Sequence, residues 1–194
     1  SEIEQFVFFD ESMRARAPVP MLTVNTVGPT IMNHGSDEQK ARFLPQVLAG
    51  EVHFCIGYSE AEAGTDLAAL KTRADLAEDG SGDYIINGSK LWTSLASDAD
   101  YCWLAVRTDQ EASKHGGLSM FLVDMKSEGI RIDPLKLLSN HDINAVFFDD
   151  VRVPAENLVG GLNKGWKLIT SQLNHERVTL CAPGMIEGAY ESVL

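Results

Sequence analysis

The spacing of apolar residues changes twice along this chain. Up to about residue 50 the apolar residues recur at the three- and four-residue spacing of helices, as in segment 21–35. In segment 52–153 the spacing falls to two, and β-branched and aromatic residues predominate, which is typical of strands. A glycine-rich segment after Pro154 leads into a second helical pattern that begins at Trp166. This order predicts an α+β protein: helices, then seven to eight short antiparallel strands in a barrel or sandwich, then a long helix.

The same changes divide the chain into three expected parts. We expect residues 1–50 to be helical, residues 51–156 to form a β-domain and residues 157–194 to begin a second helical part. Ser1 opens directly into a helical pattern, and the last residues show no capping signal. We therefore expect the sequence to be a piece of a longer chain.

Three local signals refine this picture. Gly35 follows a helical segment and is expected to end it in the left-handed conformation. Ser36 and Gln39 have the spacing of a capping box, which predicts the start of the next helix. The dipeptide Asn87-Gly88 between apolar runs is the strongest hairpin signal in the chain, because both residues tolerate the positive φ of a type I′ turn.

Composition and charge exclude several functions. The chain is 44% hydrophobic and 23% charged, as expected for a globular protein, and its net charge of −12 would repel a nucleic acid backbone. No apolar stretch approaches the roughly 20 residues that cross a bilayer, and we expect a cytoplasmic protein. The three cysteines are far apart, so buried free thiols are expected rather than a zinc or redox pair. The histidines share no ligand spacing, so no metal site is expected; they are His34, His53, His115, His141 and His175.

Segment 57–69, with the sequence GYSEAEAGTDLAA, has the composition of neither a strand nor a core helix. The hydroxyls of Ser59 and Thr65 and the amides near Gly64 are donors grouped at the end of an expected strand. Such a group suits a ligand rich in acceptors. The alternative is a solvated loop whose polar side chains bond only to their own backbone.

The last helical pattern carries a carboxylate in an unexpected place. An apolar stripe is formed by Trp166, Ile169, Leu173 and Leu180, and Glu176 falls on it. Burial there would raise the pKa of Glu176 towards the range of a general base. The alternative is a structural carboxylate, paired with Arg177 or facing a cavity.

Four successive stretches resemble the acyl-CoA dehydrogenase family in order and spacing. They are GYSEAEAGTDLAALKTRA from Gly57, NGSKLWTS from Asn87, FFDDVRVPAENLVGGLNKGW from Phe147 and LNHERV from Leu173. The first departs from the common family form at Ala61, where proline is usual, and at Tyr58, where a smaller aliphatic is usual. The resemblance implies the end of an N-terminal helical domain, a middle β-domain and the start of a C-terminal helical bundle, truncated here.

The resemblance also implies FAD as cofactor. It places the backbone from Ile56 to Thr65 at the pyrimidine edge of the flavin, Trp92 beside the ring, and Thr93 with Ser94 near N5. Fixed donors around a flavin tune its potential, which agrees with this arrangement. The alternative for Trp92 is a core position at a strand end. The cofactor-binding residues implied by the resemblance are Ile56, Gly57, Tyr58, Ser59, Ala63, Gly64, Thr65, Trp92, Thr93 and Ser94.

For catalysis the resemblance implies Glu176 as the proton-abstracting base and Arg177 as its support, as in the isovaleryl and long-chain branches. Most members carry the base on a later helix, which lies outside these residues. Substrate contacts are implied for Thr65, Asn174 and Arg177. The LNHERV stretch is similar to actinobacterial enzymes that act on bulky acyl chains, including steroid side chains, some of which have two different subunits.

The implied reaction is α,β-dehydrogenation of an acyl-CoA to a trans-2-enoyl-CoA, with electrons passed to an electron-transfer flavoprotein. A homo- or hetero-oligomer is expected, and residues 1–194 alone are expected to be inactive and to hold FAD weakly. Two alternatives stay open: a non-catalytic subunit or flavin- and CoA-binding scaffold of the same fold, and a related flavin oxidase or monooxygenase.

Overall fold

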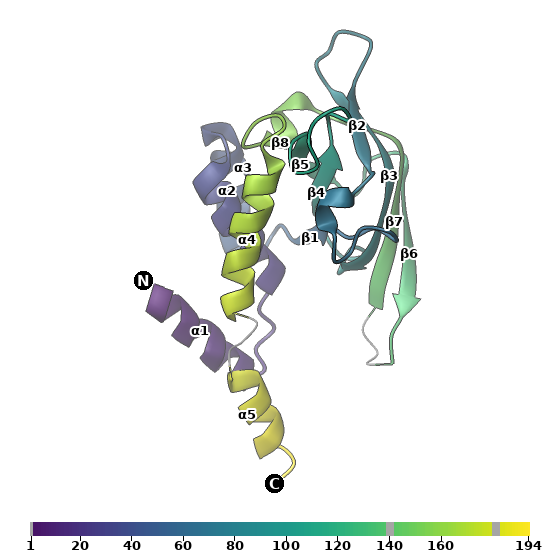
Figure 1. Ribbon diagram of the computed structural model, residues 1–194. Coiled ribbons are helices and arrows are strands. Elements are labelled where there is room, and N and C mark those ends of the chain that lie inside the picture. The colour runs from purple at the N-terminus through teal and green to yellow at the C-terminus, as the bar shows by residue number, and fades with distance from the viewer. Residues whose placement is uncertain (1, 139–141, 180–182) are drawn as a thin grey trace.

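The computed structural model describes residues 2–138, 142–179 and 183–194 (Figure 1). The helical elements are α1 (Glu2–Arg14), the π-helix η1 (Leu22–Val27), α2 (Gly28–His34), α3 (Asp37–Ala49), the 3-10 helices η2 (Leu67–Ala69) and η3 (Ala155–Asn157), α4 (Gly165–Thr179) and α5 (Gly184–Glu191). The strands are β1 (Phe54–Gly57), β2 (Arg73–Leu76), β3 (Tyr84–Ser94), β4 (Tyr101–Arg107), β5 (Leu118–Asp124), β6 (Ile130–Lys136), β7 (Asp142–Val153) and β8 (Leu158–Val159). The predicted α+β order of helices, strands and helices is confirmed.

The strands form one eight-stranded sheet of mostly antiparallel pairs. Its order is β6-β7-β3-β2-β4-β5-β8, with β1 paired to β4 outside this path. The β1–β4 and β2–β4 pairs are parallel, and β2 meets β4 only through Arg73 and Arg107. The predicted antiparallel sheet is confirmed for most pairs, and these two pairs depart from it. Alternation of side chains has the same period in both kinds of pair, so it does not distinguish them.

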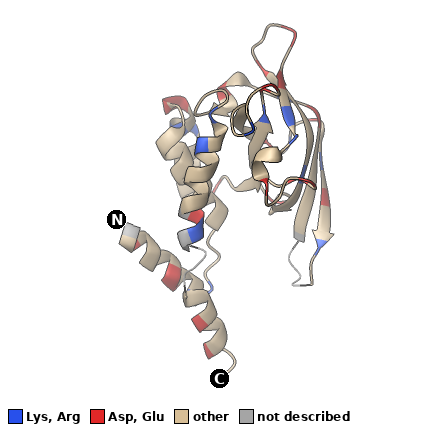
Figure 2. Ribbon diagram, viewed as in Figure 1, with Lys and Arg blue, Asp and Glu red and all other residues tan. Residues whose placement is uncertain are grey.

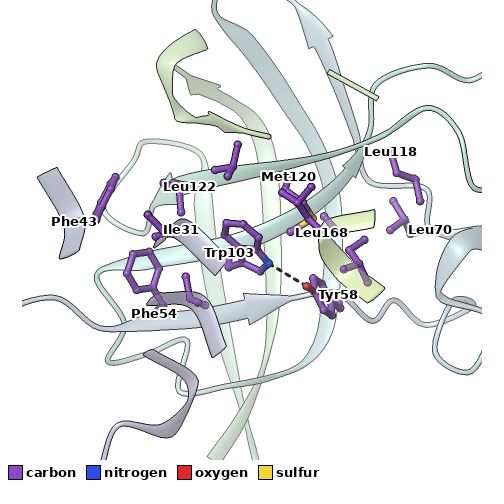
Figure 3. Packing of buried hydrophobic residues seen from close by; sticks show 14 of the residues in the cluster. Ile31, Phe43, Phe54, Tyr58, Leu70, Trp103, Leu118, Met120, Leu122 and Leu168 are labelled. Atoms are coloured by element: carbon purple, nitrogen blue, oxygen red, sulfur yellow. Dashed lines mark hydrogen bonds between the residues drawn. The ribbon is translucent and has the colours of Figure 1, made fainter. Parts of the chain in front are cut away.

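Strands β4 and β5 are buried on both faces, which explains their nearly continuous apolar sequences. On one face Trp103 and Leu122 join a core with the helices, shown in Figure 3. On the other face Leu104 and Phe121 join a second core with β3 and β7. The free thiols of Cys55 and Cys102 are also buried, as predicted, whereas Cys181 lies outside the described residues.

Helix α3 begins at the predicted capping box. The Ser36 hydroxyl accepts from the Gln39 amide at 3.2 Å, and the Gln39 side chain accepts from the Ser36 amide at 3.0 Å. Gly35 does end α2, but it is extended, with φ −69° and ψ 158°, so the predicted left-handed stop is wrong. A Cβ there would lie 2.7 Å from the Ile31 carbonyl oxygen, so close approach to the preceding turn explains this glycine.

Asn87-Gly88 does not form a hairpin. Strand β3 continues through both residues, and its pairing with β7 shifts register between Ile86 and Gly88. A Cβ on Gly88 would lie 2.7 Å from the Thr72 Cα, and the Asn87 side chain exchanges hydrogen bonds with Asp150. The two residues therefore form a bulge in a long strand. The same dipeptide occurs in hairpin turns, so the sequence alone does not distinguish the two structures.

Helix α4 lies between the α2–α3 pair and the strands (Figure 1). Helices α1 and α5 pack against each other and extend away from the remainder of the chain (Figure 1). The Gly184 amide donates to Asp10 Oδ1 at 2.7 Å, and Arg14 pairs with Glu187 at 2.6 Å. The position of α4 brings its polar residue Gln172 against Tyr58, which directly follows β1.

Candidate functional site

The loop that follows β1 is held in place by a buried ion pair. Glu60 accepts from the amides of Lys71 at 2.7 Å and Thr72 at 2.9 Å, and its Oε1 lies 2.8 Å from Lys90 Nζ. The Lys90 side chain is fully buried and also donates to the Tyr58 carbonyl at 3.1 Å. The polar composition of this loop is thus partly explained by an internal partner on β3.

Burial and pairing oppose each other in this ion pair. Burial lowers the pKa of Lys90, and the Glu60 charge only partly offsets that effect. Burial also tends to raise the pKa of Glu60, but the Lys90 ammonium and the two backbone amides outweigh it, so the pKa is lowered. The ionised Glu60 carboxylate therefore stabilises the charged form of Lys90 inside the sheet.

Trp92, near the end of β3, has a strained backbone conformation. Its φ is 64°, which is uncommon for a residue other than glycine, and it lies where pairing with β7 shifts register between Lys90 and Thr93. Trp92 is 57% exposed, so the alternative of a core tryptophan is wrong. Such strain is concentrated at functional sites, and bulges redirect side chains. The Oγ1 of Thr93 is buried and has no hydrogen-bond partner within the described part of the chain.

Two cavities lie side by side between α4 and the end of β1. The Trp92 cavity, of about 180 Å³, is lined by Leu22, Ile56, Tyr58, Ser59, Leu91, Trp92, Ser94, Leu173 and Glu176. The Arg177 cavity, of about 500 Å³, is lined by Tyr58, Ser59, Gly64, Thr65, Asp66, Leu67, Ala68, His115, Trp166, Thr170, Leu173 and Arg177. Tyr58, Ser59 and Leu173 line both cavities.

Glu176 and Arg177 face different cavities because successive helical residues point about 100° apart. Ile169 is fully buried, and Trp166 and Leu173 pack against the same core, as the apolar stripe predicts. Leu180, the last member of the stripe, lies outside the described residues. Glu176 is half-buried rather than fully desolvated, and its Oε2 accepts from Gln172 Nε2 at 2.9 Å.

The structure brings most of the predicted site residues to these two cavities. Ile56, Tyr58, Ser59, Trp92, Ser94 and Glu176 line the Trp92 cavity, and Gly64, Thr65 and Arg177 line the Arg177 cavity. Asn174 is exposed on α4, and Ala63 is buried in the loop. Gly57 ends β1, where a Cβ would lie 2.7 Å from Leu104 Cδ1. Nine of the predicted residues thus line the two cavities beside α4, whereas Gly57, Ala63, Thr93 and Asn174 do not.

Sequence reasoning missed two polar residues of this region. Gln172 is fully buried on α4, and His115 lies in the Arg177 cavity with its ring 4.6 Å from that of Trp166. The signal for Gln172 was its position four residues before Glu176 on one helix. No local signal marks His115, because it reaches the cavity from the loop after β4.

Charged residues are scattered over the described chain, and Figure 2 shows no continuous band of Lys and Arg. The described residues contain no group of three side chains able to hold a metal ion. No described helix combines the length and the apolar character needed to cross a membrane.

Family models match nearly the whole chain up to the start of η3. The model described as "Acyl-CoA dehydrogenase, N-terminal domain" matches residues 1–51, and that described as "Acyl-CoA dehydrogenase, middle domain" matches residues 55–151. Among curated relatives, acyl-CoA dehydrogenase FadE26 of Mycobacterium tuberculosis is 52% identical over 196 residues, covering 100% of this chain and 48% of FadE26.

Solved structures of similar proteins share the arrangement. The Tcur3481-Tcur3483 steroid ACAD matches with a TM-score of 0.93 and 49% identity, covering 100% of this chain and 50% of that one. The ChsE4-ChsE5 complex from Mycobacterium tuberculosis matches with a TM-score of 0.83 and 52% identity. The match covers 90% of this chain and 45% of the matched chain. The chain therefore spans about half the length of the relatives it matches.

Proposed function

This chain belongs to the acyl-CoA dehydrogenase family, and we propose that it forms part of an FAD-dependent enzyme that converts an acyl-CoA thioester to a trans-2-enoyl-CoA. The observation that carries the proposal is the convergence of Trp92, Ser94 and Glu176 on one cavity. Trp92 and Ser94 lie on a strand and Glu176 on a helix, and Glu176 is more than eighty positions from both in the sequence. The carboxylate of Glu176 therefore lines the same small cavity as the exposed ring of Trp92 and the hydroxyl of Ser94.

The residues around the Trp92 cavity suit a flavin. Trp92 offers an exposed aromatic surface, Thr93 holds a buried hydroxyl without a partner in the described chain, and Ser94 is exposed beside it. We propose that these residues and the backbone from Ile56 to Thr65 hold the isoalloxazine. FAD held there would supply the acceptor for the β-hydrogen of the substrate, which leaves as hydride.

We propose that Glu176 removes the α-proton. Its half-buried carboxylate lies on α4, and its neighbours in the cavity are largely apolar, including Leu22, Leu91 and Leu173. Apolar walls keep water from competing with the substrate for the base. Arg177, with Thr65 in the adjoining and larger cavity, is positioned to bind the polar part of a CoA thioester. Asn174, exposed on the same helix, is proposed as a further substrate contact.

We also propose a bulky acyl group such as a steroid side chain, a second subunit, an electron-transfer flavoprotein as acceptor and a cytoplasmic location. The first two proposals are supported by the similarity to a steroid ACAD and to a complex of two named chains. The acceptor rests on the family resemblance, and the location rests on the expectation drawn from the sequence pattern.

The reaction is tested by mixing the complete FAD-loaded enzyme anaerobically with a steroid-side-chain CoA thioester. We expect the flavin absorbance to bleach, and mass spectrometry to show a product that has lost two hydrogens. Electron-transfer flavoprotein should reoxidise the flavin faster than oxygen does. Absence of bleaching would favour a non-catalytic subunit, and rapid reoxidation by oxygen would favour an oxidase or monooxygenase.

The position of Trp92 can be tested by fluorescence. If its ring lies against the flavin, adding FAD will quench its emission, and Trp92→Phe will remove most of the quenching while leaving the fold intact. Trp103, which is fully buried, and Trp166 remain as internal references in the variant. Undiminished quenching in Trp92→Phe would place the flavin elsewhere.

A further inference from the structure

A chain of hydrogen bonds leads from the core of the sheet to Glu176. Trp103 Nε1 donates to the Tyr58 hydroxyl at 3.0 Å, and that hydroxyl donates to Gln172 Oε1 at 2.5 Å. Gln172 Nε2 then donates to Glu176 Oε2 at 2.9 Å. Figure 3 shows the first of these bonds inside the core. Four side chains from β4, the end of β1 and α4 are therefore linked in series.

The three supporting side chains are rigidly placed. Trp103 and Gln172 are fully buried, and Tyr58 is 8% exposed. Each is fixed by a different element, so the chain forms only when β4, the loop after β1 and α4 pack together. A fully buried glutamine would be costly without partners for both its oxygen and its nitrogen.

The chemistry of the groups sets the direction of every bond. An indole N–H can only donate, so the Tyr58 oxygen accepts from Trp103 and its proton is directed to Gln172. The Gln172 oxygen is thereby occupied by a donor, which turns the amide nitrogen towards Glu176. Burial raises the pKa of Tyr58 well above its usual range, so the phenol keeps the proton that this order requires.

We propose that Trp103, Tyr58 and Gln172 are positioning residues that hold one oxygen of Glu176 and leave the other to take the substrate α-proton. This inference rests on the proposed function, in which Glu176 is the base. Gln172 lies four residues before Glu176, so its amide binds the carboxylate from the preceding helical turn. The fixed amide removes rotational freedom from the carboxylate and presents a permanent donor to its ionised form.

Tyr58→Phe tests the chain with the least disturbance, because it keeps the ring and removes only the hydroxyl. Gln172 would then lose the donor that orients its amide. We expect flavin reduction by the steroid-side-chain CoA thioester to slow by about three- to tenfold, the size of one hydrogen bond, with FAD content and acyl-CoA affinity unchanged. Exchange of the α-proton of an acyl-CoA analogue that cannot be oxidised should slow by the same factor when it is measured with solvent deuterium.

Gln172→Leu provides a second variant, because leucine suits the apolar surroundings and removes both bonds. It should slow α-proton exchange at least as much as Tyr58→Phe, and it decides the question if Tyr58→Phe does not fold. Tyr101→Phe is the matched control. Its hydroxyl bonds to Arg42 at 2.9 Å and lies outside both cavities, so reduction should proceed at the wild-type rate.

A purely structural role is distinguished by combining variants. Adding Tyr58→Phe to Glu176→Gln should cause no further slowing if Tyr58 acts through the Glu176 carboxylate. Equal slowing in both backgrounds, or wild-type rates in Tyr58→Phe and Gln172→Leu, would overturn the positioning role while leaving Glu176 as the base. A wild-type rate in Glu176→Gln would instead overturn the assignment of the base itself.

Discussion

Glu176→Gln will slow reduction of the bound flavin by acyl-CoA at least about a hundredfold, because a general base typically contributes about 10² to 10⁴ in rate. Glutamine has nearly the size of glutamate and can still accept from Gln172 Nε2, which lies 2.9 Å from the native carboxylate. FAD content and acyl-CoA binding should therefore persist. Anaerobic stopped-flow measurement of flavin bleaching, after binding has been confirmed by the flavin spectral shift, measures the effect directly.

Glu128→Gln is a suitable control for this experiment. Glu128 is exposed in the turn between β5 and β6 and lines neither cavity, so its neutralisation should leave the rate unchanged. If the flavin of Glu176→Gln is reduced at a rate within threefold of that of the wild type, the base lies on another helix and Glu176 is a structural carboxylate.

Glu60→Gln will lower the free energy of unfolding by about 3–5 kcal/mol, the usual cost of leaving one charge of a buried ion pair without its partner. The Lys90 side chain is fully buried and that of Glu60 is 10% exposed, so little solvent is available to replace the lost charge. Urea unfolding followed by the emission of buried Trp103 will report the change. We expect the variant also to bind FAD less tightly, because Glu60 anchors the loop that contains Ser59 and Gly64.

Two further variants isolate the charge effect. Glu62→Gln breaks the exposed pair between Glu62 and Lys71, whose side chains are 76% and 75% exposed, and should lower the free energy of unfolding far less than Glu60→Gln does. Adding Lys90→Met to Glu60→Gln removes the stranded ammonium and should recover much of the lost stability. A loss in Glu60→Gln as small as that in Glu62→Gln would show that the pair contributes no more than a surface contact.

The effect of Glu60→Gln should depend on pH. The pKa of Glu60 is lowered in the folded chain, so its contribution is complete above the ordinary value of 4.5 and is lost as the pH falls through the folded value. The stability difference between wild type and variant should therefore narrow progressively below pH 4.5.

The sequence by itself determined the order of the elements and several of their ends. A period of three to four residues reports which side of a helix is apolar, and α4 packs with the predicted side against the core. The nearly continuous apolar sequences of β4 and β5 indicated strands, and both strands are buried on both faces. The Ser36 capping box is equally local, since both of its partners lie within one helical turn. The sequence also predicted that Glu176 lies on the apolar stripe of α4, because the stripe depends only on spacing within one helix.

Only the tertiary structure decided how the distant segments meet. Asn87-Gly88 has the local preferences of a turn, but pairing of β3 with β7 along both sides of the dipeptide made it a bulge. Trp92 was open to either a core or a cavity position until the register shift turned it outward. Strand pairing gains many contacts at once, which outweighs the preference of two residues.

The same limit applies to the chain of bonds that ends at Glu176. Tyr58 and Gln172 are 114 positions apart, and no periodic pattern links them. Their contact arises because α4 packs across the end of β1, where a phenol and an amide must find partners once water is excluded. Local sequence determines which residues can bond, whereas the packing of separate elements determines which of them do, because burial removes the alternative of bonding to water.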